Sequence, residues 1–157
     1  NIQLFKESNL DLEFEDLPKL NYKSFFTIMC ACNAINKNIV SKPNEDFSWI
    51  CNNTLKGLRN IKNIYTINTS TLLTNQLLVQ KKDQIKILLK KKLESFGVEN
   101  FKNMSIHFWK YAYSNSSSEI DSYLNNKYNL GLCGDAFGKG KVDGAITSAD
   151  SLIKKII

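Results

Sequence analysis

Apolar and polar residues alternate along several short segments rich in β-branched and aromatic side chains, a pattern that predicts strands. The predicted strands are residues 22–32, 47–51, 64–69, 104–113 and 129–133. Because successive side chains of a strand point to opposite sides of a sheet, segment 104–113 has two distinct faces. One face holds His107, Trp109, Tyr111 and Tyr113, and the other holds Ile106, Phe108 and Ala112.

Two further segments repeat apolar residues at helical spacing. Residues 81–96 have lysines opposite the apolar stripe and Gly97 as a stop signal; the stripe is Ile85, Leu88, Leu89, Leu93 and Phe96. Residues 144–157 form the second predicted helix, with Asp143 as its N-cap. Its predicted inward face is Ala145, Ile146, Ala149, Ile153 and Ile156. This order of elements predicts the α/β (mixed α+β) class, and neither a helix bundle nor a β-sandwich.

The length and composition fit one domain with a buried core, since the chain has 157 residues and is 43% apolar. No apolar run approaches the roughly 20 residues that span a bilayer, and no basic-then-apolar leader is present. We therefore expect a cytoplasmic protein with no membrane partner, and neither a disordered tail nor a disulfide-stabilised miniprotein. Because the first residue is Asn1, we expect a processed chain or a piece of a longer protein.

The net charge of +6 suggests a nucleic-acid partner, but the residues that carry this charge argue against one. Of the 21 basic residues only Arg59 is Arg, and the other 20 are Lys. Bidentate recognition of phosphate or guanine favours Arg, so we expect no nucleic-acid partner. The 19 Asn residues point to A/T-rich codons, which explain the basicity more simply.

The four cysteines and the single histidine do not form a metal-binding pattern. Cys30 and Cys32 are two residues apart, Cys51 and Cys133 are distant, and no Cys-x-x-Cys pair occurs. His107 has no neighbouring residue of a metal-ligating type. We expect buried free thiols in a reducing compartment, and no metal site.

The glycine-rich segment 134–144 lies between a predicted strand and a predicted helix, and it is the strongest candidate for chemistry. Glycine lets a backbone approach a ligand closely, and a helix N-terminus favours an anion. Asp135, at the end of a strand, can accept hydrogen bonds from sugar hydroxyls. Neither a P-loop nor a Gly-x-Gly-x-x-Gly fingerprint fits, because Asp135, Val142 and Asp143 occupy required positions. The alternative interpretation is a tight strand-to-helix connection without a ligand.

Three motifs of the chain resemble renalase-like flavoproteins of the FAD-dependent amine oxidase superfamily. Gly134-Asp135, a short variable loop and Val142-Asp-Gly-Ala-Ile-Thr-Ser-Ala149 resemble the family's C-terminal signature. His107-Phe-Trp-Lys-Tyr-Ala112 resembles its His-x-Trp-x-Tyr-Ala strand, and residues 47–56 resemble a substrate-domain strand that ends in an Asn-containing turn. The resemblance covers residues 22–157.

The resemblance implies an oxidoreductase with non-covalent FAD, which takes hydride from NAD(P)H or an amine-like small-molecule substrate and passes electrons to oxygen. Asp135 would contact the ribityl or pyrophosphate part of FAD, and Gly144 and Ala145 would open the helix that points at the flavin. The full set of implied cofactor-binding residues is Gly134, Asp135, Val142, Asp143, Gly144 and Ala145. Trp109 and Tyr111 would belong to the aromatic wall beside the flavin ring, although a strand tryptophan is commonly a core residue. The resemblance assigns no catalytic residue, and we expect His107 to be structural.

The resemblance also divides the chain into parts. Residues 1–20 would be the tail end of the FAD-binding half, 21–127 a mixed-sheet substrate domain with a packed helix, and 128–157 the C-terminal FAD-binding strand–turn–helix. The family's Gly-x-Gly-x-x-Gly segment does not occur in these 157 residues. We therefore expect the chain to be inactive alone and to need the N-terminal FAD-binding half, or a separate polypeptide that supplies it. The alternative is a non-catalytic fragment or subunit that acts as a protein-interaction module.

Overall fold

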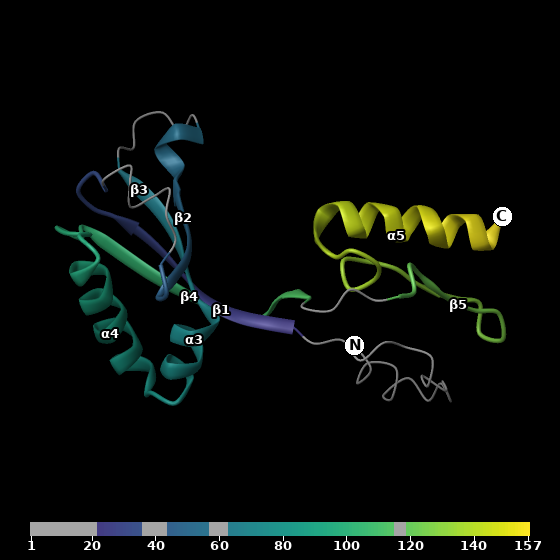
Figure 1. The fold of residues 1–157 in the computed structure, drawn as a ribbon, viewed down its shortest axis with the longest axis horizontal. Coiled ribbons are helices and arrows are strands. Elements are labelled where there is room, and N and C mark those ends of the chain that lie inside the picture. Colours follow the sequence, from purple (N-terminus) through teal and green to yellow (C-terminus); the bar gives the residue numbers. More distant parts are fainter. Residues whose placement is uncertain (1–21, 36–43, 57–62, 115–118) are drawn as a thin grey trace. The chain divides into compact units, whose positions relative to one another are not determined.

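Strand β1 (Tyr22–Ala31) is an inner strand of a four-stranded antiparallel sheet with the order β2-β3-β1-β4 (Figure 1). The other strands are β2 (Phe47–Asn52), β3 (Ile64–Thr69) and β4 (Asn103–Ser114). This computed structural model describes residues 22–35, 44–56, 63–114 and 119–157. The mixed α+β class is confirmed, and all four strands lie within one residue of their predicted bounds. The sheet itself is antiparallel and not the mixed sheet that the resemblance implied.

The chain forms two units, which we describe separately. The sheet unit is Lys23–Ala112, and the hairpin unit contains Tyr22 and Tyr113–Ile157. The predicted boundary between residues 127 and 128 falls inside the hairpin unit, because β5 (Tyr123–Asn125) pairs with β6 (Leu130–Leu132). The predicted tail of an FAD-binding half, residues 1–20, lies outside the described residues.

Two helices cover one face of the sheet because of the strand order. β3 and β4 flank β1 and are both antiparallel to it, so they run in the same direction. A connection between parallel strands has to cross the sheet. Helices α3 (Thr71–Leu78) and α4 (Lys82–Ser95) make this crossing and lie on the same side of the sheet (Figure 1). The face away from them, called here the open face, carries no α-helix among the described residues of the sheet unit.

The hydrophobic core lies between the sheet and these two helices. β1 and β3 contribute the alternate side chains that face the helices, and each helix contributes two leucines. These residues are Phe26, Ile28, Cys30, Tyr65, Ile67, Leu73, Leu77, Leu89 and Leu93. The hydroxyl of Tyr65 accepts a hydrogen bond from the N–H of Ile35 at 3.0 Å, so this large buried side chain also satisfies its polar atom.

Two buried threonines join β1, β3 and α3. The Thr69 hydroxyl accepts from the N–H of Phe26 at 2.9 Å and lies 2.7 Å from the Thr74 hydroxyl. Thr74 donates to the carbonyl of Ser70 at 2.6 Å, and Ser70 caps α3 by accepting from the N–H of Leu73 at 3.1 Å. Every hydroxyl of this network therefore has a partner.

In the hairpin unit, helix α5 (Lys141–Ile156) packs on the β5–β6 hairpin through small and polar side chains (Figure 1). The hydroxyls of Ser122 and Ser151 lie 3.0 Å apart, and Lys155 donates to the carbonyl of Ser122 at 2.6 Å. A Cβ at Gly131 would lie 2.8 Å from a methyl group of Leu152, so glycine at this position lets α5 approach the hairpin.

Two predictions about this helix are wrong. α5 begins at Lys141 and not at residue 144, and its N-cap is Gly140, whereas Asp143 lies in the first turn. The predicted inward face is also incorrect: the fully buried residues of α5 are Gly144 and Ser148, and Ala145 and Ala149 are half-buried. The exposed fractions of Ile146, Ile153 and Ile156 are 65%, 53% and 63%. The prediction is wrong because hydrophobic periodicity selects the large apolar side chains of a helix. In α5 the small side chains face the hairpin instead, and they allow the close contact between the helix and the hairpin.

The sequence pattern did not predict α3, β5 or the short 3-10 helix η1 (Asn53–Lys56). α3 has only eight residues, and its leucines occur in adjacent pairs that define no single stripe. β5 has three residues, too few for an alternation. Among the described helices, none is long and apolar enough to cross a membrane.

Candidate functional site

The turn between β6 and α5, residues 134–140, contains the first of the predicted cofactor residues. Gly134, Gly138 and Gly140 have positive φ angles of 146°, 57° and 69°. A Cβ at Gly138 would also lie 2.9 Å from a carboxylate oxygen of Asp121, and one at Gly140 would lie 3.3 Å from the carbonyl of Asp135. The backbone conformation therefore favours glycine at all three positions, and at Gly140 the nearby backbone also leaves little room for a side chain.

The turn is anchored on both sides. Ala136 and Phe137 are buried, and the N–H of Phe137 donates to the carbonyl of Gly134 at 3.1 Å. The N–H of Gly138 donates to the carbonyl of Ile120 at 3.2 Å, and the N–H of Gly134 donates to the Ser148 hydroxyl of α5, also at 3.1 Å. The exposed Asp135 therefore lies on a fixed backbone support.

Helix α5 begins without a side-chain cap, because its N-cap residue is Gly140. The N–H of Gly144 donates to the carbonyl of Gly140 at 2.9 Å. The N–H groups without an acceptor inside the helix are therefore those of Lys141, Val142 and Asp143. Together with the helix dipole they favour an anion at this end.

Gly144 does not have the role that the motif resemblance implied, because α5 already begins at Lys141. Gly144 is buried, and a Cβ there would lie 3.3 Å from the carbonyl carbon of Lys139. Its hydrogen bond to Gly140 already uses its N–H, so Gly144 does not open the helix. Instead, it lets the first turn of α5 pack against the preceding turn, while Val142 and Asp143 are exposed and Ala145 is half-buried.

The side chains around this turn carry charges of both signs. With Asp121, whose carboxylate lies beside Gly138, the acidic residues are Asp121, Asp135 and Asp143, and the basic ones are Lys139 and Lys141. Acidic residues are one in excess, so the N–H groups and not net charge would attract an anion. Burial raises the pKa of the Tyr22 hydroxyl, and the negative charge of Asp135 raises it further. Tyr22 therefore stays protonated at neutral pH within electrostatic reach of Asp135.

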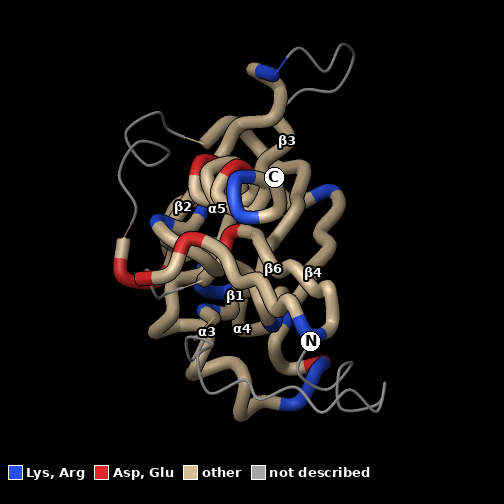
Figure 2. Tube along the Cα trace, turned by 90° about the vertical axis from the view of Figure 1, so that its right-hand side faces the viewer, with Lys and Arg blue, Asp and Glu red and all other residues tan. Residues whose placement is uncertain are grey.

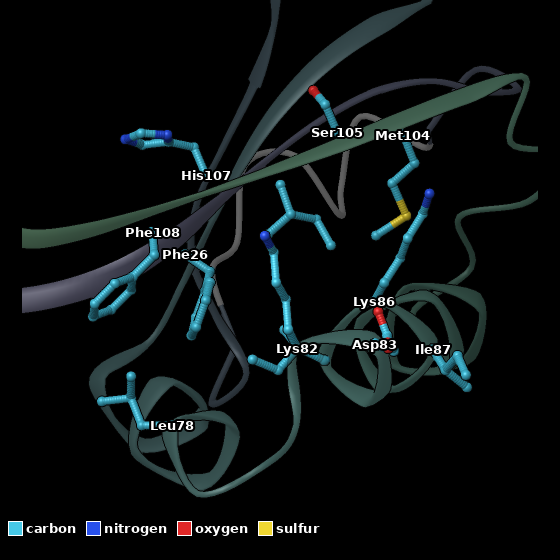
Figure 3. A pocket seen from close by; sticks show the side chains of 12 residues that line it. Phe26, Leu78, Lys82, Asp83, Lys86, Ile87, Met104, Ser105, His107 and Phe108 are labelled. Carbon is cyan, nitrogen blue, oxygen red and sulfur yellow. The ribbon is translucent and has the colours of Figure 1, made fainter.

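The open face of the sheet unit holds the two predicted aromatic wall residues. Trp109 is 48% exposed and Tyr111 is 67% exposed, so neither is a core residue. The rings of His107 and Trp109 meet edge to face with their centroids 4.4 Å apart. Figure 3 shows His107 on the side of β4 away from the helices, whereas Phe108 points toward them.

Neighbouring strands extend this open face with residues that the sequence did not indicate. Met29 and Trp49 are both nearly half exposed, and Asn68 lies opposite Trp49 on one side and Thr27 on the other. The hydroxyl of Thr27 donates to the side-chain carbonyl of Asn68 at 2.8 Å. The open face is therefore an aromatic surface with an ordered polar pair at its centre.

Simple alternation could not have placed Trp49 on the open face. In a regular strand Phe47 and Trp49 would share one face. The register of β2 against β3 shifts between these two residues, so Phe47 is buried in the core while Trp49 is exposed. A β-bulge of this kind leaves no clear signal in the spacing of apolar residues.

The described cysteines are all free, and the described residues include no group of three acidic, cysteine or histidine side chains that could hold a metal ion. Burial, together with the neighbouring Cys32, raises the pKa of Cys30 to about 12. Burial also raises the pKa of Cys32. Both thiols therefore stay protonated at neutral pH and are poor nucleophiles and metal ligands.

Basic and acidic residues both occur at several positions along the described trace (Figure 2). On α5, for example, the ammonium group of Lys154 lies 2.7 Å from the carboxylate of Asp150.

Comparisons with known proteins add no family assignment. No protein-family model matches this chain, and a search of curated proteins gives no match. The described residues therefore offer two separate candidate regions: the turn at Asp135 with the start of α5 in the hairpin unit, and the aromatic open face of the sheet unit.

Proposed function

We propose that this chain is the C-terminal part of an FAD-dependent oxidoreductase of renalase or amine-oxidase type. In this proposal Asp135 and the start of α5, in the hairpin unit, bind FAD. Trp109 and Tyr111, in the sheet unit, are proposed as flavin-wall residues from the motif resemblance alone. The observation that carries it is the uncapped start of α5, directly after a glycine turn that presents Asp135. The motif resemblance at residues 134–149 supports the same assignment.

The residues of the turn fit such a cofactor. The N–H groups of Lys141, Val142 and Asp143 suit the pyrophosphate, and the carboxylate of Asp135 can accept hydrogen bonds from the ribityl hydroxyls. No atom lies within 4 Å of the position that a Cβ would take at Gly134, so a ligand has room to approach the backbone there. When bound, FAD would supply the electron-accepting ring, with NAD(P)H or an amine-like compound as the donor and oxygen as the final acceptor.

The chain's own residues would orient the ring and exclude water from it. Trp109 and Tyr111 offer flat apolar surfaces, and the ring of His107 supports Trp109 at 4.4 Å. Adenosine binding would come from a Gly-x-Gly-x-x-Gly segment on the N-terminal FAD-binding half or on a separate polypeptide. That second part is the partner that the proposal requires.

The experiment that tests this function is FAD retention. The chain is combined with the part of the protein that carries the Gly-x-Gly-x-x-Gly segment, mixed with FAD, and desalted. We expect flavin absorbance to stay with the protein, and Asp135→Ala to abolish its retention. Lys139→Ala is the matched control, since Lys139 is exposed on the same turn and should leave retention nearly unchanged.

Two results would contradict the proposal. If no flavin is retained in any combination, the chain does not form a flavin site. If Asp135→Ala and Lys139→Ala have equal effects, the turn does not have the role assigned to it.

A second candidate function is a non-catalytic protein-interaction module, and one observation favours it. An apolar stripe along α5 is exposed, and its residues are Val142, Ile146, Ile153 and Ile156. Ile146→Glu should then weaken association with the FAD-binding half, measured by light scattering, while Thr147→Glu should not. Association that depends on this stripe, but without FAD retention, would favour the interaction module over the enzyme.

A further inference from the structure

The helix-covered side of the sheet unit contains a groove between β4 and the first half of α4. Its open volume is about 880 Å³, within the usual range of small-molecule sites (Figure 3). Phe26 lies at its base, with the ring of Phe108 at a centroid distance of 4.8 Å. Met104 and Ile106 of β4 complete the apolar wall.

The groove exists because α4 is packed closely along only part of its length. Leu89 and Leu93, in the second half of the helix, are fully buried. One turn before Leu89, Ile85 is only half-buried although it packs against the core, and Ile87 is 57% exposed. The first half of α4 therefore leaves apolar surface of β4 uncovered, at a cost in burial that a bound ligand would offset.

Two lysines give the groove its charge. Lys82 and Lys86 lie one helical turn apart, and both side chains extend from α4 toward β4 (Figure 3). Neither lysine forms an ion pair with another described residue. By contrast, two lysines later in the same helix do: Lys90 pairs with Glu94, and Lys92 pairs with Asp46. Among the described residues that line the groove, Asp83 is the one acidic residue. The groove thus combines an apolar wall with two ammonium groups that form no ion pair within the described part of the chain.

We propose that this groove binds an amphipathic carboxylate, such as a medium-chain fatty acid. The apolar tail lies against Phe26, Met104 and Phe108, and the carboxylate lies between Lys82 and Lys86. Trp109 and Tyr111 of the proposed flavin wall lie on the opposite, open face of the sheet, although His107, whose ring meets that of Trp109, also borders the groove.

The two methionines of the chain allow a direct test. Met104 lines the groove, whereas Met29 lies on the open face, so each reports on a different side of the same sheet. The full chain carrying ¹³C-methyl methionine is titrated with decanoate below its aggregation concentration. We expect the methyl resonance of Met104 to shift in a saturable manner while that of Met29 stays unchanged.

Charge variants test the head-group contact. Lys82→Met with Lys86→Met keeps most of each alkyl stem but removes both charges, and should weaken decanoate binding about tenfold or more. Lys90→Met with Lys91→Met is the matched control, because it removes the same net charge from α4 outside the groove. The control should bind decanoate with unchanged affinity, and an unchanged Met29 resonance would report that both variants are folded.

Each alternative occupant gives a distinct result that would overturn the proposal. Equal affinity for decanol or decyltrimethylammonium would mean that the groove does not select a carboxylate. A Met104 shift that depends on protein concentration without ligand would assign the groove to a second copy of the chain. An absent shift, or one equal at Met29 and Met104, would exclude the site. None of these results depends on FAD retention.

Discussion

The backbone N–H of Gly134 donates a 3.1 Å hydrogen bond to the hydroxyl of Ser148, a residue that is almost completely buried. The bond joins the end of β6 to the second turn of α5 and fixes the position where the glycine turn begins. Asp135 follows immediately, so this contact determines where its carboxylate lies relative to the start of the helix.

Ser148→Ala should therefore loosen the turn. It leaves a backbone N–H without its partner, at a cost of about 1–2 kcal/mol. We expect the amide hydrogen of Gly134 to exchange about tenfold faster, measured by NMR-detected hydrogen exchange. Thr147→Ala removes an exposed hydroxyl one residue away, which donates to the carbonyl of Asp143, and should leave the Gly134 amide unchanged. Equal rates in the two variants would show that the bond does not hold the turn.

Substitutions at two adjacent residues, Gly140 and Lys141, should change the stability of the hairpin unit in opposite directions. Gly140→Ala places a Cβ 3.3 Å from the carbonyl of Asp135 in a backbone conformation, φ 69° and ψ −174°, that only glycine readily adopts. We expect it to destabilise the hairpin unit by about 1–3 kcal/mol. Lys141 has a φ of 61°, so Lys141→Gly should relieve strain and stabilise the unit by up to about 1 kcal/mol. Hydrogen exchange of the α5 amides measures both changes in stability. If both variants were stabilised, or both destabilised, the backbone geometry at Gly140 and Lys141 would be contradicted.

Removal of the buried Thr69 hydroxyl should markedly lower the free energy of unfolding of the sheet unit. Thr69→Val keeps the volume but removes the acceptor of the Phe26 N–H and one of the two partners of the Thr74 hydroxyl, which keeps its bond to the Ser70 carbonyl, at a cost of about 2–3 kcal/mol. Urea unfolding followed by tryptophan fluorescence reports on the sheet unit, which contains both Trp49 and Trp109. Thr66→Val is the control: its hydroxyl accepts from Asn53 at 2.7 Å but is half-buried, so water can replace the bond and the loss should stay below about 1 kcal/mol.

Because the thiol of Cys30 is buried, the free energy of unfolding should fall as the pH rises through the alkaline range. The folded-state pKa of this thiol, about 12, lies above the usual 9.0, so between these values the folded chain holds a proton that the unfolded chain releases. The contribution of the protonated Cys30 thiol to the free energy of unfolding is complete below pH 9 and is lost as the pH rises toward 12. Over this range the free energy of unfolding falls with a slope approaching about 1.4 kcal/mol per pH unit.

Comparison of variants isolates this contribution from other groups that titrate at high pH. Cys30→Ala should flatten the fall in unfolding free energy above pH 9, and Cys133→Ala, at an exposed thiol, should leave the slope unchanged. If the Cys30→Ala variant retains the full slope, the titration belongs to other groups.

Sequence patterns predicted the elements in which local preference and burial agree. Residues 64–69 form β3 as predicted, because Tyr65, Ile67 and Thr69 alternate toward the core and favour a strand conformation. The helix predicted at 81–96 is α4 at Lys82–Ser95, and Leu89 and Leu93 of its predicted stripe are buried. Leu88 of the same stripe is exposed, so that part of the prediction is wrong. The glycine cluster at 134–140 also indicated its turn, since three of those glycines have positive φ.

The remaining features depend on packing that no local pattern encodes. The start of α5 was misplaced because Lys141 adopts a φ that lysine rarely takes, whereas Asp143 had the composition of an N-cap. The exposed Trp49 depends on a β-bulge, and the groove depends on how closely α4 packs along its length. The proposed head-group contact of Lys82 and Lys86 was likewise interpreted from sequence as part of a solvated helix face.

The inner position of β1 also has a consequence for how the chain is made. β1 is the first described strand to leave the ribosome, yet its partner residue for Thr27 is Asn68, 41 residues later, and β4 follows later still. Sheet formation therefore cannot start beside β1; it has to wait until β3 has been synthesised. During that interval Phe26, Ile28 and Cys30 lack the core partners that β3 and the two helices supply, and exposed apolar side chains of this kind favour aggregation.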